Sequence, residues 1–388
     1  MTLPVNPLLQ EVEAPPISEA MTWAGRNGGN RSFINLSQAV PSYPPSPALQ
    51  EHVARVARDA ETSLYSDIAG LAELRKALAG HMSESYRGAI DARDVLISAG
   101  CNQAFCLALM AIARSGDNII LPAPFYFNHQ MWLKMQGIEV KILPTLNGAS
   151  AIPSAAEAAR LIDERTRAII LVTPNNPTGA VYPSSSISEF FELAQLREIA
   201  LVMDETYKDF RSELSPPHDI FMRPDWRGTF VQLYSFSKVY ALTGYRVGSV
   251  IADEAFLSQV EKIMDCVSIC APRISQEAAL FGLQSLASWR EGKRAMMAKR
   301  LEALRAGFGR PGLKYQLVSA GAYFAYIRHP FQGVTGKSVA RRLAAEQNVL
   351  CLPGSMFGPD QEQFLRLAFA NVEADLMDEV VDRLIESQ

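Results

Sequence analysis

Paired cysteines are missing from this sequence. Its 388 residues hold five cysteines, an odd number, and no two of them form a CxxC pair. This pattern argues against a framework of disulfides. Cys101 and Cys106 fall in an apolar stretch, where small buried thiols are expected. We therefore expect reduced cysteines and a cytoplasmic protein.

An excess of charge is missing as well. The chain has 37 basic and 41 acidic residues, so its formal net charge is −4, and no compact block of like charge occurs. This balance predicts neither a nucleic-acid partner nor a membrane partner. Hydrophobic residues make up 48% of the chain and charged residues 20%, as in ordinary globular proteins, and the length indicates two or three domains.

Long hydrophobic runs and metal-binding spacings are absent too. Residues 95–113 carry no charge, but Ser98, Gly100, Asn102 and Gln103 interrupt them. A strand, a turn and a buried helix explain this stretch better than a membrane span. The first ten residues lack a basic segment followed by an apolar core, so we expect no signal peptide. The five histidines show no ligand spacing, so no metal is expected.

Short apolar runs that alternate with helical segments are what the sequence does contain. The expected strands cover residues 95–98, 118–121, 168–173, 199–203, 230–235 and 247–251. Helical patterns lie between several of them, for example at 104–113 and 187–197. Apolar strands joined by helices predict an α/β fold with a mostly parallel sheet that helices cover on both faces.

A smaller α+β unit is expected after a long helix at 288–308. Beyond this helix the pattern predicts strands at 321–327 and 364–370 and helices at 337–347 and 373–387. The first 45 residues are rich in proline and glycine and indicate an extended arm with little regular structure. We therefore predict an arm (1–45) that packs with a small domain (288–388), and a large domain (46–287).

Polar residues follow several of the expected strands. Lys238 ends the run SFSK after strand 230–235, and Asp204 and Tyr207 follow strand 199–203. The run NNPTG at 175–179 follows strand 168–173, and residues 100–102 open the next helix, where free amides favour phosphate. Ligands of such sheets collect at these strand ends. A lysine amine, an acid for a pyridine nitrogen and a phosphate site are what pyridoxal phosphate requires.

Further motifs in the same order make the chain resemble a fold-type I pyridoxal-phosphate aminotransferase of class I/II. Residues 35–45 are similar to the entry arm of kynurenine- and methionine-type aminotransferases. Tyr65, Gly70 and the pair Leu74-Arg75 match the family's Tyr-x4-Gly-x3-Leu-Arg pattern. Residues 352–358 and Arg366-Leu367 match its C-terminal signature. The resemblance runs through nearly the whole chain.

The resemblance implies a role for each matched residue. Lys238 would form the Schiff base and then act as general acid/base, Asp204 would pair with the pyridinium nitrogen, and Arg366 would bind the substrate α-carboxylate. The other implied contacts to the cofactor are donation to its phenolic oxygen by Tyr207 and Asn176, stacking by Tyr126, and phosphate binding by Ser235, Ser237, Arg246 and the amides of Cys101 and Asn102. Tyr65 would reach the cofactor phosphate of a neighbouring subunit, which implies a homodimer with shared active sites.

Three residues bear on which substrate is used. Ala39 stands where the family usually has glycine, on the arm that closes over the substrate. Tyr323 is expected to line the substrate pocket, and we expect a structural ion pair for Arg273. The arm favours neutral donors, aromatic or methionine-like, with a 2-keto acid as acceptor.

Two alternative functions remain at this point. A C–S β-lyase or an aminocyclopropane-carboxylate-type synthase would use the same lysine, acid and arginine. A pyridoxal-phosphate-sensing regulator would need an extra basic DNA-binding domain, for which we expect no room because the fold starts near Ile34.

Overall fold

The computed structural model describes residues 3–24, 31–145 and 151–388. Its larger sheet has seven strands in the order β2-β8-β7-β6-β5-β3-β4. Within this sheet β8 pairs antiparallel with both of its neighbours, β2 and β7, and the other described pairs are parallel. In this order the strands are β2 (Val95–Ser98), β8 (Gly248–Ile251), β7 (Phe230–Ser235), β6 (Ala200–Asp204), β5 (Thr166–Val172), β3 (Asn118–Ala123) and β4 (Glu139–Pro144). The predicted mostly parallel α/β sheet is confirmed.

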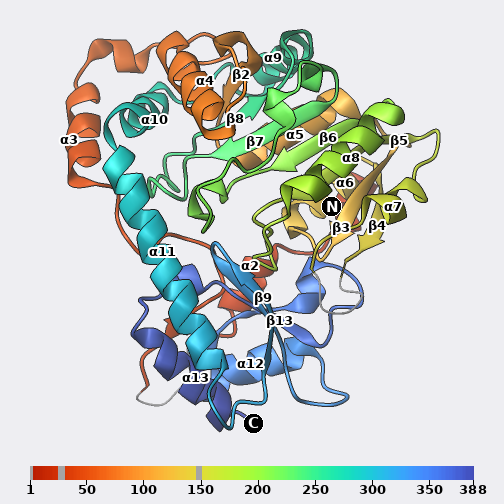
Figure 1. Cartoon of the computed structure of the whole chain (residues 1–388), viewed down its shortest axis with the longest axis vertical. Coiled ribbons are helices and arrows are strands. Elements are labelled where there is room, and N and C mark those ends of the chain that lie inside the picture. Colours follow the sequence, from red (N-terminus) through yellow and green to blue (C-terminus); the bar gives the residue numbers. More distant parts are fainter. Residues whose placement is uncertain (1–2, 25–30, 146–150) are drawn as a thin grey trace.

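Helices lie on both faces of this sheet (Figure 1). The inner strands β3 and β7 are buried at every position, because apolar side chains point into both layers of helices. α5 (Cys101–Ile112) packs against β7 and β8, and α8 (Ser184–Leu196) packs against β6. The remaining helices of this part are α3 (Pro47–Val56), α4 (Ala72–Tyr86), α6 (Phe127–Met135), α7 (Ala155–Ala159), α9 (Glu254–Ser268) and α10 (Arg273–Ser285).

A second, antiparallel sheet forms the lower part of the molecule in Figure 1. Its order is β12 (Leu352–Pro353), β13 (Phe364–Leu367), β10 (Phe324–Arg328) and β9 (Gln316–Gly321). The long helix α11 (Ala287–Phe308) runs from the side of the larger sheet down to this one, where it packs against α13 (Leu376–Glu386) and β9. α12 (Gly336–Glu346) packs against β12 and β13. The two parts touch closely where Gly179 meets Gly321, since a Cβ on Gly179 would lie 2.4 Å from the Gly321 nitrogen.

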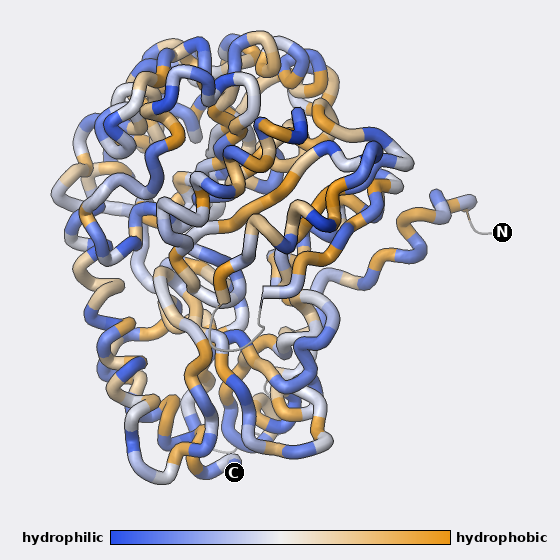
Figure 2. Tube along the Cα trace, turned by 45° about the vertical axis from the view of Figure 1, so that its right-hand side comes forward, coloured by the Kyte–Doolittle hydropathy of each residue, from blue (hydrophilic) through white to orange (hydrophobic). Residues whose placement is uncertain are grey.

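The N-terminal arm contains more regular structure than its proline content suggested. It forms α1 (Pro7–Gln10), α2 (Pro16–Met21) and β1 (Ile34–Asn35), and β1 pairs in parallel with β11 (Val349–Leu350). Proline occupies the first position of both helices, where its missing N–H costs no hydrogen bond. Figure 2 shows the first described residues reaching away from the body of the protein.

Two predicted strands of the smaller sheet differ from the structure. The single strand expected at 321–327 is a hairpin of β9 and β10, because the chain turns at Ala322 with φ 48°. The strand expected at 364–370 stops at Leu367 and gives way to a short 3-10 turn, Phe369–Asn371. The uncharged stretch 95–113 forms β2, a turn and α5, as expected. No helix within the described residues is both long and apolar enough to cross a membrane.

Candidate active site

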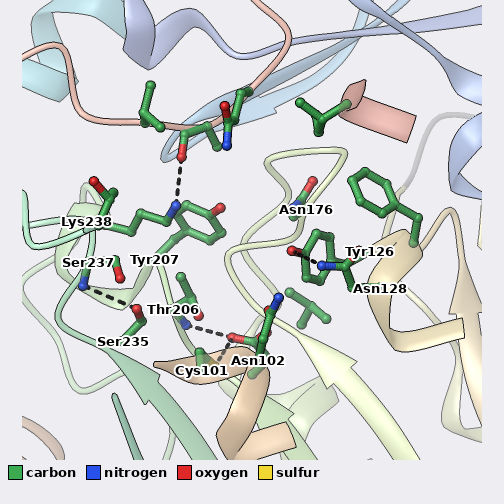
Figure 3. Close-up of a pocket in the computed structure, with 18 of the residues that line it drawn as sticks. Cys101, Asn102, Tyr126, Asn128, Asn176, Thr206, Tyr207, Ser235, Ser237 and Lys238 are labelled. Atoms are coloured by element: carbon green, nitrogen blue, oxygen red, sulfur yellow. Dashed lines mark hydrogen bonds between the residues drawn. The ribbon is translucent and has the colours of Figure 1, made fainter. Parts of the chain in front are cut away.

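A cavity of about 390 Å³ lies where β6, β7 and α5 meet the arm and the smaller sheet (Figure 3). Strand β6 ends at Asp204 and β7 at Ser235, and α5 begins at Cys101, so polar side chains collect at one edge of the sheet. The residues predicted for the site that line this cavity are Ala39, Cys101, Asn102, Tyr126, Asn176, Asp204, Tyr207, Ser235, Ser237, Lys238, Arg246 and Arg366.

Lys238 extends its amine across the cavity toward the arm. Its Nζ donates to the Ala39 carbonyl oxygen at 2.7 Å and lies 5.6 Å from the centre of the Tyr207 ring. The Tyr43 hydroxyl donates to the Lys238 carbonyl oxygen at 3.0 Å and so ties the arm to the lysine's own backbone. Burial lowers the pKa of Lys238 to about 8, and the nearby Arg246 cation acts in the same direction. At pH 7 about a tenth of this amine is therefore neutral, far more than for a lysine with its usual pKa.

Asp204 is a buried carboxylate that three donors hold in place. The backbone N–H of Thr206 donates to its Oδ1 at 3.0 Å, and the Cys101 thiol lies 3.6 Å from the same atom. The other oxygen, Oδ2, is 3.4 Å from His129 Nε2. Burial alone would raise the pKa of this carboxyl, but the hydrogen bonds from His129 and Thr206 lower it below its usual range. Asp204 therefore presents a fixed negative charge to the cavity.

Cationic and hydroxyl groups converge at the N-terminus of α5. Arg246 Nη1 donates to the Thr243 carbonyl oxygen at 2.9 Å and lies 3.5 Å from Ser237 Oγ. Ser235 Oγ accepts from the Ser237 backbone N–H at 3.2 Å. Gly100 has φ 85°, and a Cβ there would lie 2.2 Å from Arg246 Nη2. A guanidinium, two hydroxyls and a helix N-terminus in one place could hold a phosphate group.

Arg366 lies in β13, on the opposite side of the cavity. Its Nη1 donates to Asn176 Oδ1 at 3.0 Å, Nη2 donates to the Ser37 carbonyl oxygen, and the guanidinium lies 4.8 Å from the centre of the Phe324 ring. Burial lowers the pKa of Arg366 to about 10, so the group remains charged at neutral pH. Its Nε has no hydrogen-bond partner within the described residues although it is buried. Such a group fits a bound carboxylate.

Tyr65, Tyr323 and Arg273 do not line this cavity. Tyr65 is 72% exposed and does not line the cavity of its own chain. Tyr323 is fully buried outside the cavity lining, with its ring 5.2 Å from that of Tyr207. Arg273 forms the predicted ion pair, with Glu61 at 3.4 Å.

Sequence reasoning missed several residues of the site. His129 received no role from the sequence, yet it contacts Asp204. Its place three residues after Tyr126, the N-cap residue of α6, was the available signal, and the two rings lie 5.2 Å apart in the structure. His129 lies behind Asp204 and does not line the cavity; the cavity-lining residues that were not predicted are Pro15, Ile17, Gln38, Val40, Phe127, Asn128, Val172, Thr206 and Thr243.

Comparison with known proteins identifies the family. The family model for class I and II aminotransferases matches residues 31–384. The chain belongs to this family. It is therefore a pyridoxal-phosphate-dependent aminotransferase, and the predicted fold and cofactor are confirmed.

The aminotransferase has similar relatives in several organisms. It is 29% identical to an aspartate aminotransferase of Thermotoga maritima over 361 residues, which cover 90% of each chain. It is 26% identical to aromatic-amino-acid aminotransferase 2 of Thermococcus litoralis, with 92% of each chain covered. The solved structure of YbdL from Escherichia coli shares the fold, with a TM-score of 0.90, 23% identity, and coverage of 99% of this chain and 100% of that one. The aminotransferase names of these relatives favour transamination over the lyase alternative.

The cavity of this aminotransferase fits pyridoxal phosphate. Lys238 would offer an amine for the aldehyde, and ionised Asp204 would offer a partner for a protonated ring nitrogen. Arg246, Ser235 and Ser237 would hold the phosphate at the start of α5. When bound, the cofactor supplies an electron sink for the bond broken at the substrate α-carbon. Within the described residues, no group of three or more histidine, cysteine, aspartate or glutamate side chains could hold a metal ion.

Proposed function

We propose that this aminotransferase takes the amino group from L-amino acids with neutral side chains, aromatic or methionine-like, and passes it to a 2-keto acid. The observation that carries this proposal is the distribution of charge in the cavity. Among the described residues that line it, the lysines and arginines are Lys238, Arg246 and Arg366. Each has a task in binding the cofactor or the α-carboxylate, so the cavity-lining cations of a chain's own site leave none for a second carboxylate of the substrate.

Apolar side chains support the same proposal. Pro15, Ile17, Val40 and Phe127 line the cavity, and the first three belong to the arm. A hydrophobic substrate side chain would gain about 25 cal/mol for each Å² that it buries against such a wall. Burying a carboxylate there without a partner would instead cost several kcal/mol, on the order expected for an unpaired charge. A neutral donor therefore suits this wall better than aspartate.

Lys238 and Arg366 would divide the work on the substrate. Arg366 would bind the α-carboxylate with its guanidinium, which orients the α-carbon toward Lys238. The Lys238 amine would then remove the α-proton and return a proton at the cofactor end. This shuttle requires a neutral amine, and burial favours that state by lowering the pKa to about 8. Asp204 would stay ionised throughout and so balance the positive charge of the cofactor's ring nitrogen.

The remaining predicted roles are part of the proposal. Tyr207 and Asn176 line the cavity and would donate to the cofactor's phenolic oxygen, while Tyr126 would stack on its ring. Cys101 and Asn102 open α5 and would offer their amides to the phosphate. Ala39 lies on the arm above Lys238, where its methyl group would restrict the substrate.

We also propose a homodimer in which Tyr65 serves the neighbouring subunit. The Tyr65 side chain is exposed in its own chain, next to exposed Leu64. A hydrogen bond of 2.9 Å from Gln276 Nε2 to Ser66 Oγ fixes the loop that carries Tyr65 to α10. An exposed tyrosine on an anchored loop is well placed to contact a second copy.

The division into an arm (1–45), a large domain (46–287) and a small domain (288–388) is supported by the two sheets and by the pairing of β1 with β11. A cytoplasmic location stays a prediction.

A panel of amino donors tests the proposal. We expect kcat/KM for L-phenylalanine, L-tyrosine or L-methionine with 2-oxoglutarate to exceed that for L-aspartate by about a hundredfold, since an unpaired carboxylate costs a few kcal/mol. An Ile17→Arg variant should narrow this gap by adding a cation to the wall, and Met21→Arg, at an exposed position of the same helix, is the control. A preference of the wild-type enzyme for aspartate would contradict the proposal.

A further inference from the structure

Lys238 lies in a turn that belongs to neither of the neighbouring strands. β7 ends at Ser235 and β8 begins at Gly248. Within this segment the backbone N–H of Ala241 donates to the Lys238 carbonyl oxygen at 3.2 Å, and Ala241 has φ 56°. A residue other than glycine persists in this left-handed conformation only where its surroundings hold it there. The turn that carries the lysine therefore needs support from other parts of the chain.

Two aromatic side chains supply that support. The Tyr43 hydroxyl of the arm donates to the Lys238 carbonyl oxygen at 3.0 Å. The indole Nε1 of Trp289, in the first turn of α11, donates to the carbonyl oxygen of the next residue, Val239, at 3.1 Å. The Tyr43 hydroxyl lies 3.4 Å from this second oxygen as well. Two consecutive carbonyl oxygens of the turn are thus bonded by side chains from two distant parts of the sequence.

Lys293 joins the two aromatic rings. Its Nζ lies 4.1 Å from the centre of the Tyr43 ring and 4.1 Å from the centre of the Trp289 ring. The rings meet edge to face, with their centres 5.9 Å apart and their planes at 73°. Lys293 follows Trp289 by four residues on α11, and this spacing places both side chains on one face of the helix. Because a cation attracts the faces of both rings, the two donors and Lys293 form one cluster.

We propose that Tyr43 and Trp289 are positioning residues, which fix the backbone of Lys238 and thereby the place of its amine. The arm holds this lysine at both ends, since the Ala39 carbonyl oxygen accepts from Nζ at 2.7 Å while Tyr43 bonds the main chain. Trp289 adds a second fixed point from α11. Misplacement of a reacting group by about 1 Å can slow a reaction about a hundredfold. The inference rests on the proposed role of Lys238.

The pKa of the Lys238 amine reports its position. Burial is the largest influence that lowers this pKa to about 8. The charged groups that act on the amine are Arg246, Asp204 and Arg366, and substitutions at Tyr43 or Trp289 leave these charges in the protein. A looser turn would let water reach the amine and so move its pKa back toward the usual value. A merely structural loss of stability would not produce this change.

Acetylation of the cofactor-free protein by acetic anhydride tests the inference without relying on activity. Tyr43→Phe and Trp289→Phe each keep an aromatic ring and remove one donor. We expect the pH of half-maximal Lys238 acetylation to rise by about one unit in both variants. Tyr315→Phe is the matched control, since it removes a hydroxyl 2.9 Å from Ser387 Oγ near the C-terminus, and its profile should stay near pH 8. A profile that stays near pH 8 in both test variants would overturn the proposal, even if their activity falls.

Steady-state kinetics of the holoenzyme separate positioning of the lysine from closure of the arm. For the best donor of the panel, kcat should fall about tenfold in each variant while KM changes by less than about twofold, because Arg366 still binds the α-carboxylate. A raised KM with unchanged kcat in both variants would contradict the proposal. Since both donors hold one turn, the double variant should lose less than the product of the single losses, about a hundredfold. A loss equal to that product would show that the two residues support separate features.

Folding and the role of Lys238 are checked separately. The unfolding midpoint of each variant is measured first, and Tyr43→Phe, which removes a single oxygen atom, keeps the test decisive if Trp289→Phe does not fold. A Lys238→Ala variant that still transaminates would refute the role of the lysine but would leave the acetylation result in place. The preference among donors enters neither measurement. Failure of this inference can therefore be told apart from failure of the proposed function.

Discussion

At the scale of single residues, the enzyme depends on the environment of one amine. The Lys238 side chain is buried, and the guanidinium groups of Arg246 and Arg366 both disfavour its protonated form. Asp204 opposes them, but burial is the largest influence. Part of the Lys238 amine is therefore already neutral, and so able to react, in the protein without substrate.

This environment predicts the pH dependence of Lys238 reactivity in cofactor-free protein. Only a neutral amine is acylated, so modification by acetic anhydride should reach half its maximum rate near pH 8. Exposed lysines have pKa values near the usual value of about 10.4, so their modification rate should still be rising with pH at that point. Peptide mass spectrometry across a pH series measures both rates in one sample. A Lys238 profile that coincides with that of the exposed lysines would contradict the account.

At the scale of elements, the junction between β2 and α5 shapes the phosphate site. Gly100 joins the two elements at φ 85°, and Arg246 crosses directly over it. Close approach of a guanidinium to a helix N-terminus requires a residue without a side chain at this point.

Gly100→Ala should therefore lower the affinity for pyridoxal phosphate, by about a hundredfold if the Arg246 contact is lost. Gly116→Ala is the matched control, since Gly116 has φ 91° but open space around it. Both substitutions should cost about 1–2 kcal/mol in backbone strain. Equilibrium titration of the cofactor-free proteins with pyridoxal phosphate measures the difference. Equal affinities in the two variants would show that the Arg246 contact is unimportant.

Elements also show which parts of the fold sequence patterns can predict. The strands at 95–98 and 230–235 have the predicted bounds, because each is an apolar run closed by polar residues. β4 was not predicted, since only one of its six residues is buried. The contact between His129 on α6 and Asp204 on β6 joins residues 75 positions apart, so the spacing of His129 from Tyr126 indicates the face on which it lies but not its partner. Pairing of β1 with β11 joins the arm to a strand more than 300 residues away for the same reason.

At the scale of the whole molecule, the catalytic cavity is closed by segments from opposite ends of the chain. Arg366 near the C-terminus donates to the Ser37 carbonyl oxygen of the arm, and Asn371 donates to Asn35 and Gln38. The arm also reaches Lys238 through Ala39. Hydrogen bonds thereby connect the arm, which covers the cavity, with the C-terminal segment and with the reacting amine.

Sharing of sites between subunits can be tested by mixing two inactive variants. Lys238→Ala lacks the amine, and Tyr65→Ala lacks the side chain proposed to serve the neighbour. In a mixed dimer, the Lys238 of one chain would work with the Tyr65 of the other. Random reassociation of equal amounts should restore about a quarter of the wild-type activity per site. A mixture that stays as inactive as its components would argue against the shared site.

The most direct test of the central claim is a single turnover without a keto acid. Holoenzyme mixed with L-phenylalanine or L-methionine alone should release one equivalent of keto acid per chain and then stop, because the enzyme retains the amino group. Addition of 2-oxoglutarate should restart turnover and yield glutamate, and Lys238→Ala should show neither phase. Continuous release of keto acid and ammonia without 2-oxoglutarate would identify a lyase and contradict the account.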